Sequence, residues 1–380
     1  MLGIVMTTTA MCLCAFWSVV LALDLLKYGN RAAHRELLVW CVTSTVLYVG
    51  HFVFFNRYTS YLPFFDSVYS ICNLAVYPLY LYYLLVLTKG RACLSFKLYC
   101  FGVPLLVGMV MVLLYCNMSH SDILSFIDIY LYQNSYEGLA GKALMLAVVH
   151  SVAKVLFAVS VFLTLIWGTV IIKRYDETIA SFYSDVEDRS LRTLKTILVL
   201  LFFTSLVSLV VNFLGKYYFA RSSLLLLVPF TFFAILLFCI CRVGSELKYS
   251  YVDMQKDMSA DAESQGSNSE MSGADRAVND DRLRSDLRHL MREEKIFLKP
   301  DLRITDLTSQ LGTNRRYLSE LFNRDLGLSF SDYVNQRRIE YAKKLMEDNP
   351  DMSLYEVMTR SGYLSKSSFY RNMKRFGSST

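Results

Sequence analysis

The sequence lacks the short motifs that mark several classes of enzyme. It contains no H-E-x-x-H motif of zinc proteases, no G-x-G-D motif of intramembrane proteases and no phosphate-binding P-loop. A kinase or receiver signature is also missing. We therefore expect a protein that is not an enzyme and that uses no cofactor.

Cysteine is missing from the carboxyl-terminal third of the chain. All nine cysteines lie before residue 242, most of them inside long apolar runs. Two C-x-C pairs, Cys12 with Cys14 and Cys239 with Cys241, have a spacing that metal-binding or redox-active pairs also use. Buried thiols that pack as small apolar side chains explain them more simply, so we expect no metal site.

Charged residues are scarce in the first two thirds of the chain. Only 19% of all residues are charged, whereas 54% are hydrophobic. Because about 20 apolar residues cross a bilayer as a helix, the pattern predicts seven spans, at 3–26, 37–55, 64–88, 98–116, 146–172, 196–214 and 222–241. No basic residue precedes the first span and no small-residue cleavage pattern follows it, which favours a retained helix over a signal peptide.

Basic residues gather in alternate loops between these spans. The loops after the first, third and fifth spans hold eleven Lys or Arg residues, and the other three loops hold four. Positive residues are retained on the cytoplasmic side. The pattern therefore predicts a multi-pass membrane protein, in contact with lipid, with its amino terminus outside and everything after residue 242 in the cytoplasm.

A few ionisable residues fall within or beside the predicted spans. Burying such groups in a membrane is costly, which makes them candidates for sensing a signal; they are His51, Asp66, His150 and Lys154. His150 and Lys154 are four residues apart on one helical face, where they could hold an anion or relay protons. Alternatively, Lys154 lies at the outer boundary of an overlong apolar run and extends its amine to water.

The longest external loop, 117–142, contains apolar residues at helical spacing. The pattern favours an interfacial helix that lies on the membrane, with a lid over a pocket between the spans as the alternative. Asn117 begins a glycosylation sequon, which we attribute to chance in a bacterial-looking sequence.

A polar segment, 243–281, follows the last predicted span. Between 249 and 281 it has eight acidic residues against Lys256 and Arg276, with many Ser, Gly and Asn residues. Such a composition cannot bury enough apolar surface to fold. A flexible coil of roughly 30 residues reaches about 30 Å, which would let the following module meet a partner while anchored.

The last segment, 282–380, is basic and has helical patterns. It holds nineteen Lys or Arg residues against thirteen Asp or Glu residues. Apolar residues at helical spacing end at Leu311, Gly312 supplies a turn, and Asn314 is a good cap for a second helix. This pattern predicts a helix-turn-helix.

A second copy of the pattern follows. Ser353 and Ser365 are suited to cap two further short helices, separated by a turn at Gly362. Between the two units, 330–348 is one amphipathic stretch with Ser329 before it and Asn349 after it. A helix of about 19 residues forms a rod of roughly 28 Å, comparable with the spacing of about 34 Å between major-groove faces on one side of DNA. Two recognition helices on such a rod could enter adjacent grooves.

These motifs resemble the DNA-binding domain of the AraC/XylS family of bacterial transcription regulators. The resemblance rests on two strings, LGTNRRYLSELFNRDLGLSFSDYVNQRRIEYAKKLM and SLYEVMTRSGYLSKSSFYRNMKR. It implies sequence-specific binding to double-stranded DNA, control of transcription with RNA polymerase as a further partner, and action as a homodimer or on repeated half-sites. The architecture also resembles membrane-anchored relatives in which the spans act as a sensor.

The chain departs from the family pattern in the first helix of each helix-turn-helix, in its last helix and at its end. Thr308 and Met358 stand where the family usually has a small Ala, and Met373 stands where it usually has Phe. The family's usual final short helix is missing after Gly377. We therefore expect the second helix-turn-helix to be less well packed.

Arg and Asn side chains are suited to bidentate hydrogen bonds with base edges. The candidate DNA-binding residues are Asn314, Arg315, Arg316, Ser319, Asn323, Arg324, Lys366, Ser367, Arg371 and Lys374. The whole sequence thus predicts an all-α protein with a seven-helix transmembrane sensor at 1–242, a flexible linker at 243–281 and a double helix-turn-helix domain at 282–380. It would be a one-component transcription regulator that responds to a small-molecule or membrane signal. The alternative is a membrane receptor or transporter whose tail is a protein-interaction module.

Overall fold

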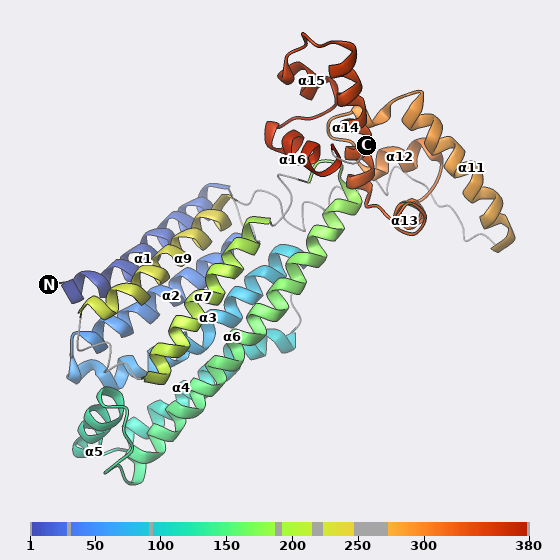
Figure 1. Cartoon of the computed structure of the whole chain (residues 1–380). Helices are drawn as coiled ribbons and strands as arrows, with labels where there is room; N and C mark the ends of the chain where they lie inside the picture. Colours follow the sequence, from blue (N-terminus) through green and yellow to red (C-terminus); the bar gives the residue numbers. More distant parts are fainter. Residues whose placement is uncertain are drawn as a thin grey trace. The chain divides into compact units, whose positions relative to one another are not determined.

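The computed structural model describes residues 2–28, 32–90, 94–186, 192–214, 223–246 and 273–377 (Figure 1). Within these ranges every regular element is a helix, which confirms the predicted all-α class. The chain divides into two compact units: Met1–Ile172 with Arg192–Val252, and Lys173–Leu191 with Asp253–Thr380.

The first unit is built from long apolar helices. They are α1 (Leu2–Tyr28), α2 (Ala32–Phe55), α3 (Leu62–Lys89), α4 (Leu94–Cys116), α6 (Gly141–Phe182, which continues into the second unit), α7 (Arg192–Leu214) and α9 (Ser223–Glu246). A short 3-10 helix, η1 (Thr59–Tyr61), precedes α3. The segment between α4 and α6 folds as α5 (His120–Ser125) followed by a π-helix, η2 (Phe126–Tyr132).

Six of these helices are long and apolar enough to cross a membrane, within the residues described. The six match six of the seven predicted spans. The other prediction, 196–214, falls on α7 (Arg192–Leu214), of which the apolar stretch Ile197–Val211 lies within the residues searched.

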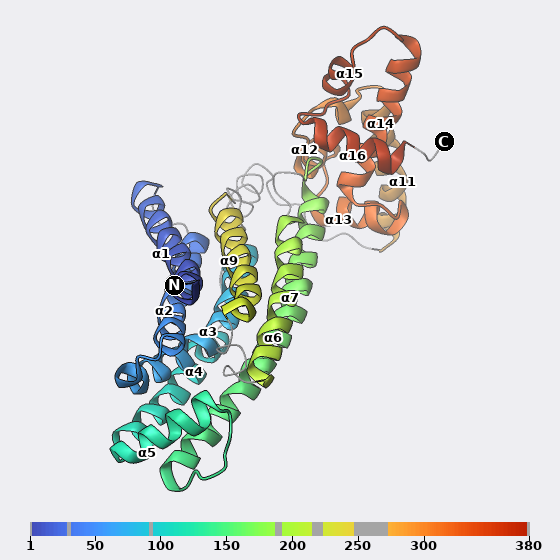
Figure 2. The same cartoon turned by 60° about the vertical axis from the view of Figure 1, so that its left-hand side comes forward.

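Helix α3 is the central helix of the first unit. In its most apolar window 78% of residues are buried, compared with 22% for α1. It packs against α2 on one side and α4 on another, whereas α1 lies beside α2 and α9 (Figures 1 and 2). Polar side chains carried by α3 are therefore held inside the unit, where other helices can present partners.

The connection between α4 and α6 corrects a sequence-based expectation. The favoured interpretation was a helix lying on the membrane, but Phe126, Ile127 and Tyr130 are at most 3% exposed. They pack with Val53, Leu62 and residues of α4 and α6 in one apolar cluster. The apolar face of this segment is thus covered by protein, as the lid alternative requires.

The second unit consists of shorter helices. They are α11 (Gly273–Arg292), the 3-10 helix η3 (Ile296–Leu298), α12 (Ile304–Leu311), α13 (Arg315–Glu320), the π-helix η4 (Leu321–Asp325), α14 (Phe330–Asp348), α15 (Leu354–Arg360) and α16 (Lys366–Phe376). The bounds of α14 agree with the amphipathic stretch predicted at 330–348.

Both ends of the predicted linker, 243–281, are helical. Helix α9 continues to Glu246 and α11 begins at Gly273, while 247–272 lie outside the described residues. The apolar side chains Leu283, Leu287 and Leu290 are buried along α11 and anchor it to the unit. Since helix propagation from an anchored turn adds a hydrogen bond per residue, polar residues before this anchor join the helix.

Helix α6 is longer than any span needs. It has 42 residues, about 63 Å at 1.5 Å per residue, compared with roughly 30 Å for a hydrocarbon core. The predicted span ended at residue 172, and the structure continues the helix to Phe182. Its last turns, from Lys173 onward, belong to the second unit.

Candidate nucleic-acid interface

The first helix-turn-helix consists of α12, a turn and α13. Gly312 ends α12 in the left-handed region at φ 60°, a conformation that costs glycine little. Asn314 then caps α13, because its side-chain oxygen accepts a hydrogen bond from the backbone N–H of Tyr317 at 2.9 Å. Both features were expected from the sequence, and together they fix where the second helix begins.

The apolar side of α13 and η4 packs the first helix-turn-helix against the rest of the domain. Leu318, Leu321 and Phe322 are at most 3% exposed. The ring of Phe322 packs against Phe330 and Tyr333 of α14, with centroid separations of 5.7 and 5.1 Å. The opposite side of α13 is therefore left for a partner.

That opposite side presents polar side chains at helical spacing. Arg316 has a 90% exposed side chain and forms an ion pair with Glu320 at 3.0 Å. Asn323 is exposed and donates to the Ser319 hydroxyl at 3.4 Å. Residues three and four apart share one face of a helix, so Arg316, Ser319 and Asn323 form one row.

Two other candidates lie off this row. Arg324 pairs with Asp325 at 2.9 Å. Hydrogen bonds from Arg324 and Arg284 lower the pKa of the Asp325 carboxyl group. The guanidinium of Arg315 lies 4.9 Å from the ring centroid of Phe182, at the end of α6, and burial lowers its pKa. Arg315 and Arg316 were both predicted to contact DNA, but in the structure Arg315 packs on a ring and Arg316 is exposed to solvent.

The second helix-turn-helix consists of α15 and α16. The Ser365 hydroxyl caps α16 by accepting from the N–H of Ser368 at 3.1 Å. Lys366, Ser367 and Lys374 are exposed and Arg371 is half-buried, so this helix also presents a polar face.

The residues that depart from the family pattern contribute to the core. Met358 is 4% exposed and packs with Val357 and Phe369, and Met373 lies against the same cluster. Thr308 is 1% exposed, and its hydroxyl donates to the carbonyl of Thr305 at 3.0 Å. The side chains of Met358 and Met373 therefore help to fill the apolar core of the second helix-turn-helix.

A buried arginine, which the sequence-based analysis missed, links α14 to the segment before α12. Arg338 is 1% exposed and donates to the carbonyls of Phe297, Lys299 and Pro300 at 2.7, 2.6 and 3.1 Å. Burial lowers its pKa to about 10, which leaves it charged at neutral pH. Its position on the buried face of an amphipathic helix was the available signal.

The four candidate sensing residues lie in the first unit, around two pockets. Asp66 accepts hydrogen bonds from the Tyr115 hydroxyl and shares one with His150 Nε2, both at 2.8 Å. Lys154 donates to the Asn134 side chain at 3.2 Å, and it lines the same pocket as His150. The partner of His150 is thus Asp66, 84 residues away in sequence, which helical spacing could not reveal.

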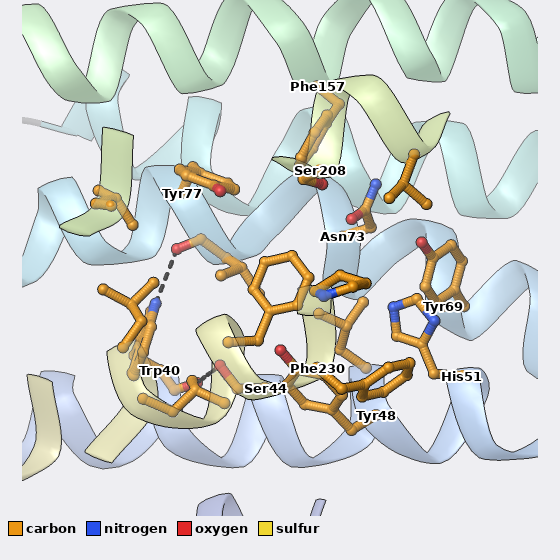
Figure 3. A pocket seen from close by; sticks show the side chains of 18 of the residues that line it. Trp40, Ser44, Tyr48, His51, Tyr69, Asn73, Tyr77, Phe157, Ser208 and Phe230 are labelled. Carbon is orange, nitrogen blue, oxygen red and sulfur yellow. Dashed lines mark hydrogen bonds between the residues drawn. The ribbon is translucent and has the colours of Figure 1, made fainter. Parts of the chain in front are cut away.

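His51 lines the larger of the two pockets, which has a volume of about 90 Å³ (Figure 3). Its imidazole stacks on Phe55 and meets the edge of Tyr69. Tyr69 and Asn73 line both pockets, so both pockets adjoin the same stretch of α3. Among the described residues no cluster of His, Cys, Asp or Glu is suited to hold a metal ion.

Comparisons with known proteins agree with this geometry. Residues 307–380 match a family described as a helix-turn-helix domain. An uncharacterized HTH-type transcriptional regulator of Staphylococcus aureus (strain MSSA476) is 33% identical over 76 residues, which are 20% of this chain and 10% of that protein. The uncharacterized HTH-type transcriptional regulator YtdP of Bacillus subtilis (strain 168) is 28% identical over 87 residues, 23% of this chain and 11% of its own length.

A third relative, the Msm operon regulatory protein of Streptococcus mutans (strain ATCC 700610 / UA159), is 32% identical over 75 residues, 20% of this chain and 27% of that protein. The chain therefore spans between about a tenth and a quarter of the length of these relatives. No solved structure matches the chain. The carboxyl-terminal region, with its two capped turn units on one connecting helix, is a helix-turn-helix domain of the AraC type, found in transcriptional regulators.

Proposed function

We propose that this chain is a membrane-anchored, one-component transcription regulator, organised as a sensor at 1–242, a linker at 243–281 and a DNA-binding domain at 282–380. The observation that carries the proposal is the row of Arg316, Ser319 and Asn323 on the second helix of a capped helix-turn-helix. The same chain contains six helices long and apolar enough to span a bilayer.

The first helix-turn-helix, formed by α12 and α13, would recognise the DNA sequence. Guanidinium and amide side chains on an exposed helical face can form paired hydrogen bonds to guanine and adenine in the major groove. Helix α16 supplies a second contact, and the 19 residues of α14 separate the two. Binding as a homodimer and contact with RNA polymerase would follow from the resemblance to the AraC/XylS regulators.

The membrane arrangement follows from the distribution of basic residues. Loops after the first, third and fifth spans hold most of the Lys and Arg residues, and such loops stay in the cytoplasm. This orientation leaves the amino terminus outside and gives the helix-turn-helix domain access to DNA from a bacterial inner membrane.

The larger pocket in the first unit is the proposed place of the signal. Side chains of α2, α3, α6, α7 and α9 line it, most of them apolar or aromatic, with Ser44, His51, Asn73 and Ser208 among the polar groups (Figure 3). Apolar walls with a few polar groups are typical of small-molecule sites. The signal would therefore be a small apolar molecule with at least one hydrogen-bonding group.

The DNA-binding part of the proposal is tested with the full chain in nanodiscs of uncharged lipid. DNA bound from a random pool is sequenced after selection at two salt concentrations, because attraction to the phosphate backbone is strongly screened by salt. A salt-resistant motif with half-sites about one helical turn apart is expected. Binding that favours no sequence and disappears on adding salt would contradict the proposal and favour an interaction tail.

Arg316→Ala is the matched variant for this experiment, with Arg282→Ala as its control. Both arginines are at least 81% exposed and both form an ion pair four residues along their helix, with Glu320 and Asp286. Arg316→Ala should weaken binding to the selected motif by roughly 1 to 3 kcal/mol if it contacts a base. Arg282→Ala, on α11, should leave the preference for the motif unchanged.

A further inference from the structure

The end of α6 is buried within the second unit. Phe182 and Tyr183 are fully buried, and Ser184 is 1% exposed. These three residues belong to Lys173–Leu191, the part of the chain before α7 that clusters with the helix-turn-helix domain. A segment more than a hundred residues away in sequence thus forms part of the core of the DNA-binding unit.

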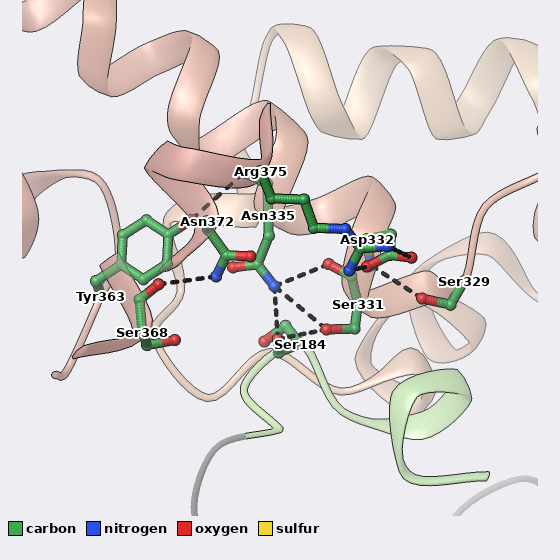
Figure 4. Close-up of polar contacts among 9 residues, drawn as sticks. All are labelled: Ser184, Ser329, Ser331, Asp332, Asn335, Tyr363, Ser368, Asn372 and Arg375. Carbon is green, nitrogen blue, oxygen red and sulfur yellow. Dashed lines mark hydrogen bonds and ion pairs between the residues drawn. The ribbon is translucent and has the colours of Figure 1, made fainter. Parts of the chain in front are cut away.

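The backbone and hydroxyl groups of Ser184 have partners in this unit. Its carbonyl accepts from the Ser331 hydroxyl at 2.9 Å and from Asn335 Nδ2 at 2.8 Å (Figure 4). Its N–H donates to the carbonyl of Leu302 at 3.0 Å, and its hydroxyl accepts from Arg338 at 3.4 Å. Buried backbone groups require such partners, and here the side chains of α14 supply two of them.

Two arginines of the first turn unit enclose the aromatic rings of the segment. The guanidinium of Arg303 lies 5.6 Å from the ring centroid of Tyr183, and these two residues also form an isolated antiparallel bridge. Arg315, the first residue of α13, lies 4.9 Å from the ring centroid of Phe182. Both separations are within the range of cation–π attraction.

We propose that residues 182–184 are a docking segment, and that the groove formed by Arg303, Ser331, Asn335 and Arg338 is a built site for it. The DNA-binding unit is then held to α6 by this contact as well as by the covalent linker at 247–272. The occupant of the groove is this named segment of the same chain, identified by its buried rings and by the paired backbone groups of Ser184.

The docked segment has a consequence for DNA binding, which rests on the proposed function. While it packs on the ring of Phe182, the half-buried guanidinium of Arg315 is held in one direction and is less free to turn toward a DNA phosphate. Docking therefore competes with one DNA contact, whereas Arg316 on the exposed row is unaffected. A change at the end of α6 that releases Phe182 would free Arg315 and raise the affinity for DNA.

The docking is tested by cutting the linker of the full chain. A protease recognition sequence is inserted within residues 247–272, the chain is placed in nanodiscs of uncharged lipid, and the linker is cleaved at high salt, where attraction between charges is screened. Size-exclusion chromatography then separates nanodiscs from released fragment. The carboxyl-terminal fragment of the wild-type sequence should stay with the nanodisc, because the groove still holds residues 182–184.

Tyr183→Ala removes a buried ring and leaves the sequence of the cleaved fragment unchanged. It should release most of the fragment, as should Ser331→Glu, which places a carboxylate against the Ser184 carbonyl from the other side of the contact. Tyr370→Ala, which removes a ring that is 55% exposed, is the matched control and should not release it. Release of the wild-type fragment, or retention in both Tyr183→Ala and Ser331→Glu, would overturn the docking.

The competition with DNA has its own readout in the uncut chain. Phe182→Ala should tighten binding to the selected DNA about two- to thirtyfold, the range between an exposed and a desolvated cation–π contact, and adding Arg315→Gln should remove this gain. An unchanged or weaker affinity in Phe182→Ala would overturn the competition. The cleavage experiment requires no DNA, so its outcome is independent of whether the proposed function holds.

Discussion

Arg375 near the end of α16 forms a bidentate ion pair with Asp332 in the first turn of α14, with nitrogen–oxygen distances of 2.6 and 2.9 Å (Figure 4). Asp332 also lies where a negative charge is favoured by the helix dipole. The pair fixes the second recognition helix to the connecting helix close to the last residues of the chain.

Breaking this ion pair should destabilise the second helix-turn-helix, formed by α15 and α16. Arg375→Ala should destabilise the packing of α16 on α14 by about 1 kcal/mol, a value suited to a bidentate pair with a largely exposed arginine. Hydrogen exchange of the α16 amides in the full chain measures the effect. Lys374→Ala, an exposed neighbour without this partner in α14, should change exchange much less, and equal effects of the two variants would contradict the role of the pair.

Arg338 should be far more important for stability than its neighbour Arg337. Arg338→Ala removes three donors and leaves the buried carbonyls of Phe297, Lys299 and Pro300 without them, at a cost of about 3 kcal/mol. Arg337→Ala removes a partly exposed pair with Glu340 and should cost less than about 1 kcal/mol. Protection of the second unit from trypsin in increasing urea compares the variants, and similar losses would argue against the buried role.

Gly362 should not tolerate a side chain. Its φ is 82°, and a Cβ built on it would lie 2.7 Å from the carbonyl oxygen of Leu298. We expect Gly362→Ala to destabilise the second unit by about 2 to 4 kcal/mol, since backbone strain adds to the clash. Gly327→Ala is the matched control, because Gly327 has φ 63° and nothing within 4 Å of its Cβ position; it should cost only about 1 to 2 kcal/mol. Thermal unfolding of the second unit, monitored by its susceptibility to proteolysis, compares the stabilities of the two variants.

Asp325 should contribute stability at neutral pH that is lost in acid. Hydrogen bonds from Arg324 and Arg284 lower its pKa in the folded state, so the folded state binds its proton more weakly than the unfolded state. The contribution is complete above the unfolded pKa of about 3.9 and disappears as the pH falls through the folded pKa. Asp325→Asn should therefore be less stable than the wild type at pH 7, and the two should become equally stable only once the pH lies below the lowered folded pKa of Asp325. A difference that persists in acid would show that the ion pairs are not its source.

Filling the larger pocket should mimic the signal if this pocket senses it. Ser208→Phe places a ring among the lining side chains and should alter the DNA affinity of the full chain in nanodiscs severalfold. Thr169→Phe, at an exposed position on α6, is the control and should leave the affinity unchanged. An unaltered affinity in Ser208→Phe, in a protein of normal thermal stability, would remove this pocket as the place of the signal.

Local sequence determined the helices and their ends. Asn314, Ser353 and Ser365 each cap the helix that follows with a hydrogen bond three residues along the chain. Apolar spacing placed α14 at 330–348, and long apolar runs predicted seven spans, six of which are described helices long and apolar enough to cross a membrane. These features were predictable because caps and periodicity depend only on neighbours within one or two turns.

Tertiary structure decided which residues meet. The pairing of His150 with Asp66 joins residues 84 apart, and the contacts of Ser184 with Ser331 and Asn335 join residues about 150 apart. Arg315 and Arg316 are adjacent and chemically identical, yet one packs on Phe182 and the other extends into solvent. Neither the composition nor the helical periodicity of a sequence shows which residues far apart in the chain will be in contact. The sequence by itself therefore determined the kinds of domain and their helices, whereas packing alone decided that the end of α6 belongs to the DNA-binding unit, because only burial of its rings and pairing of its backbone place it there.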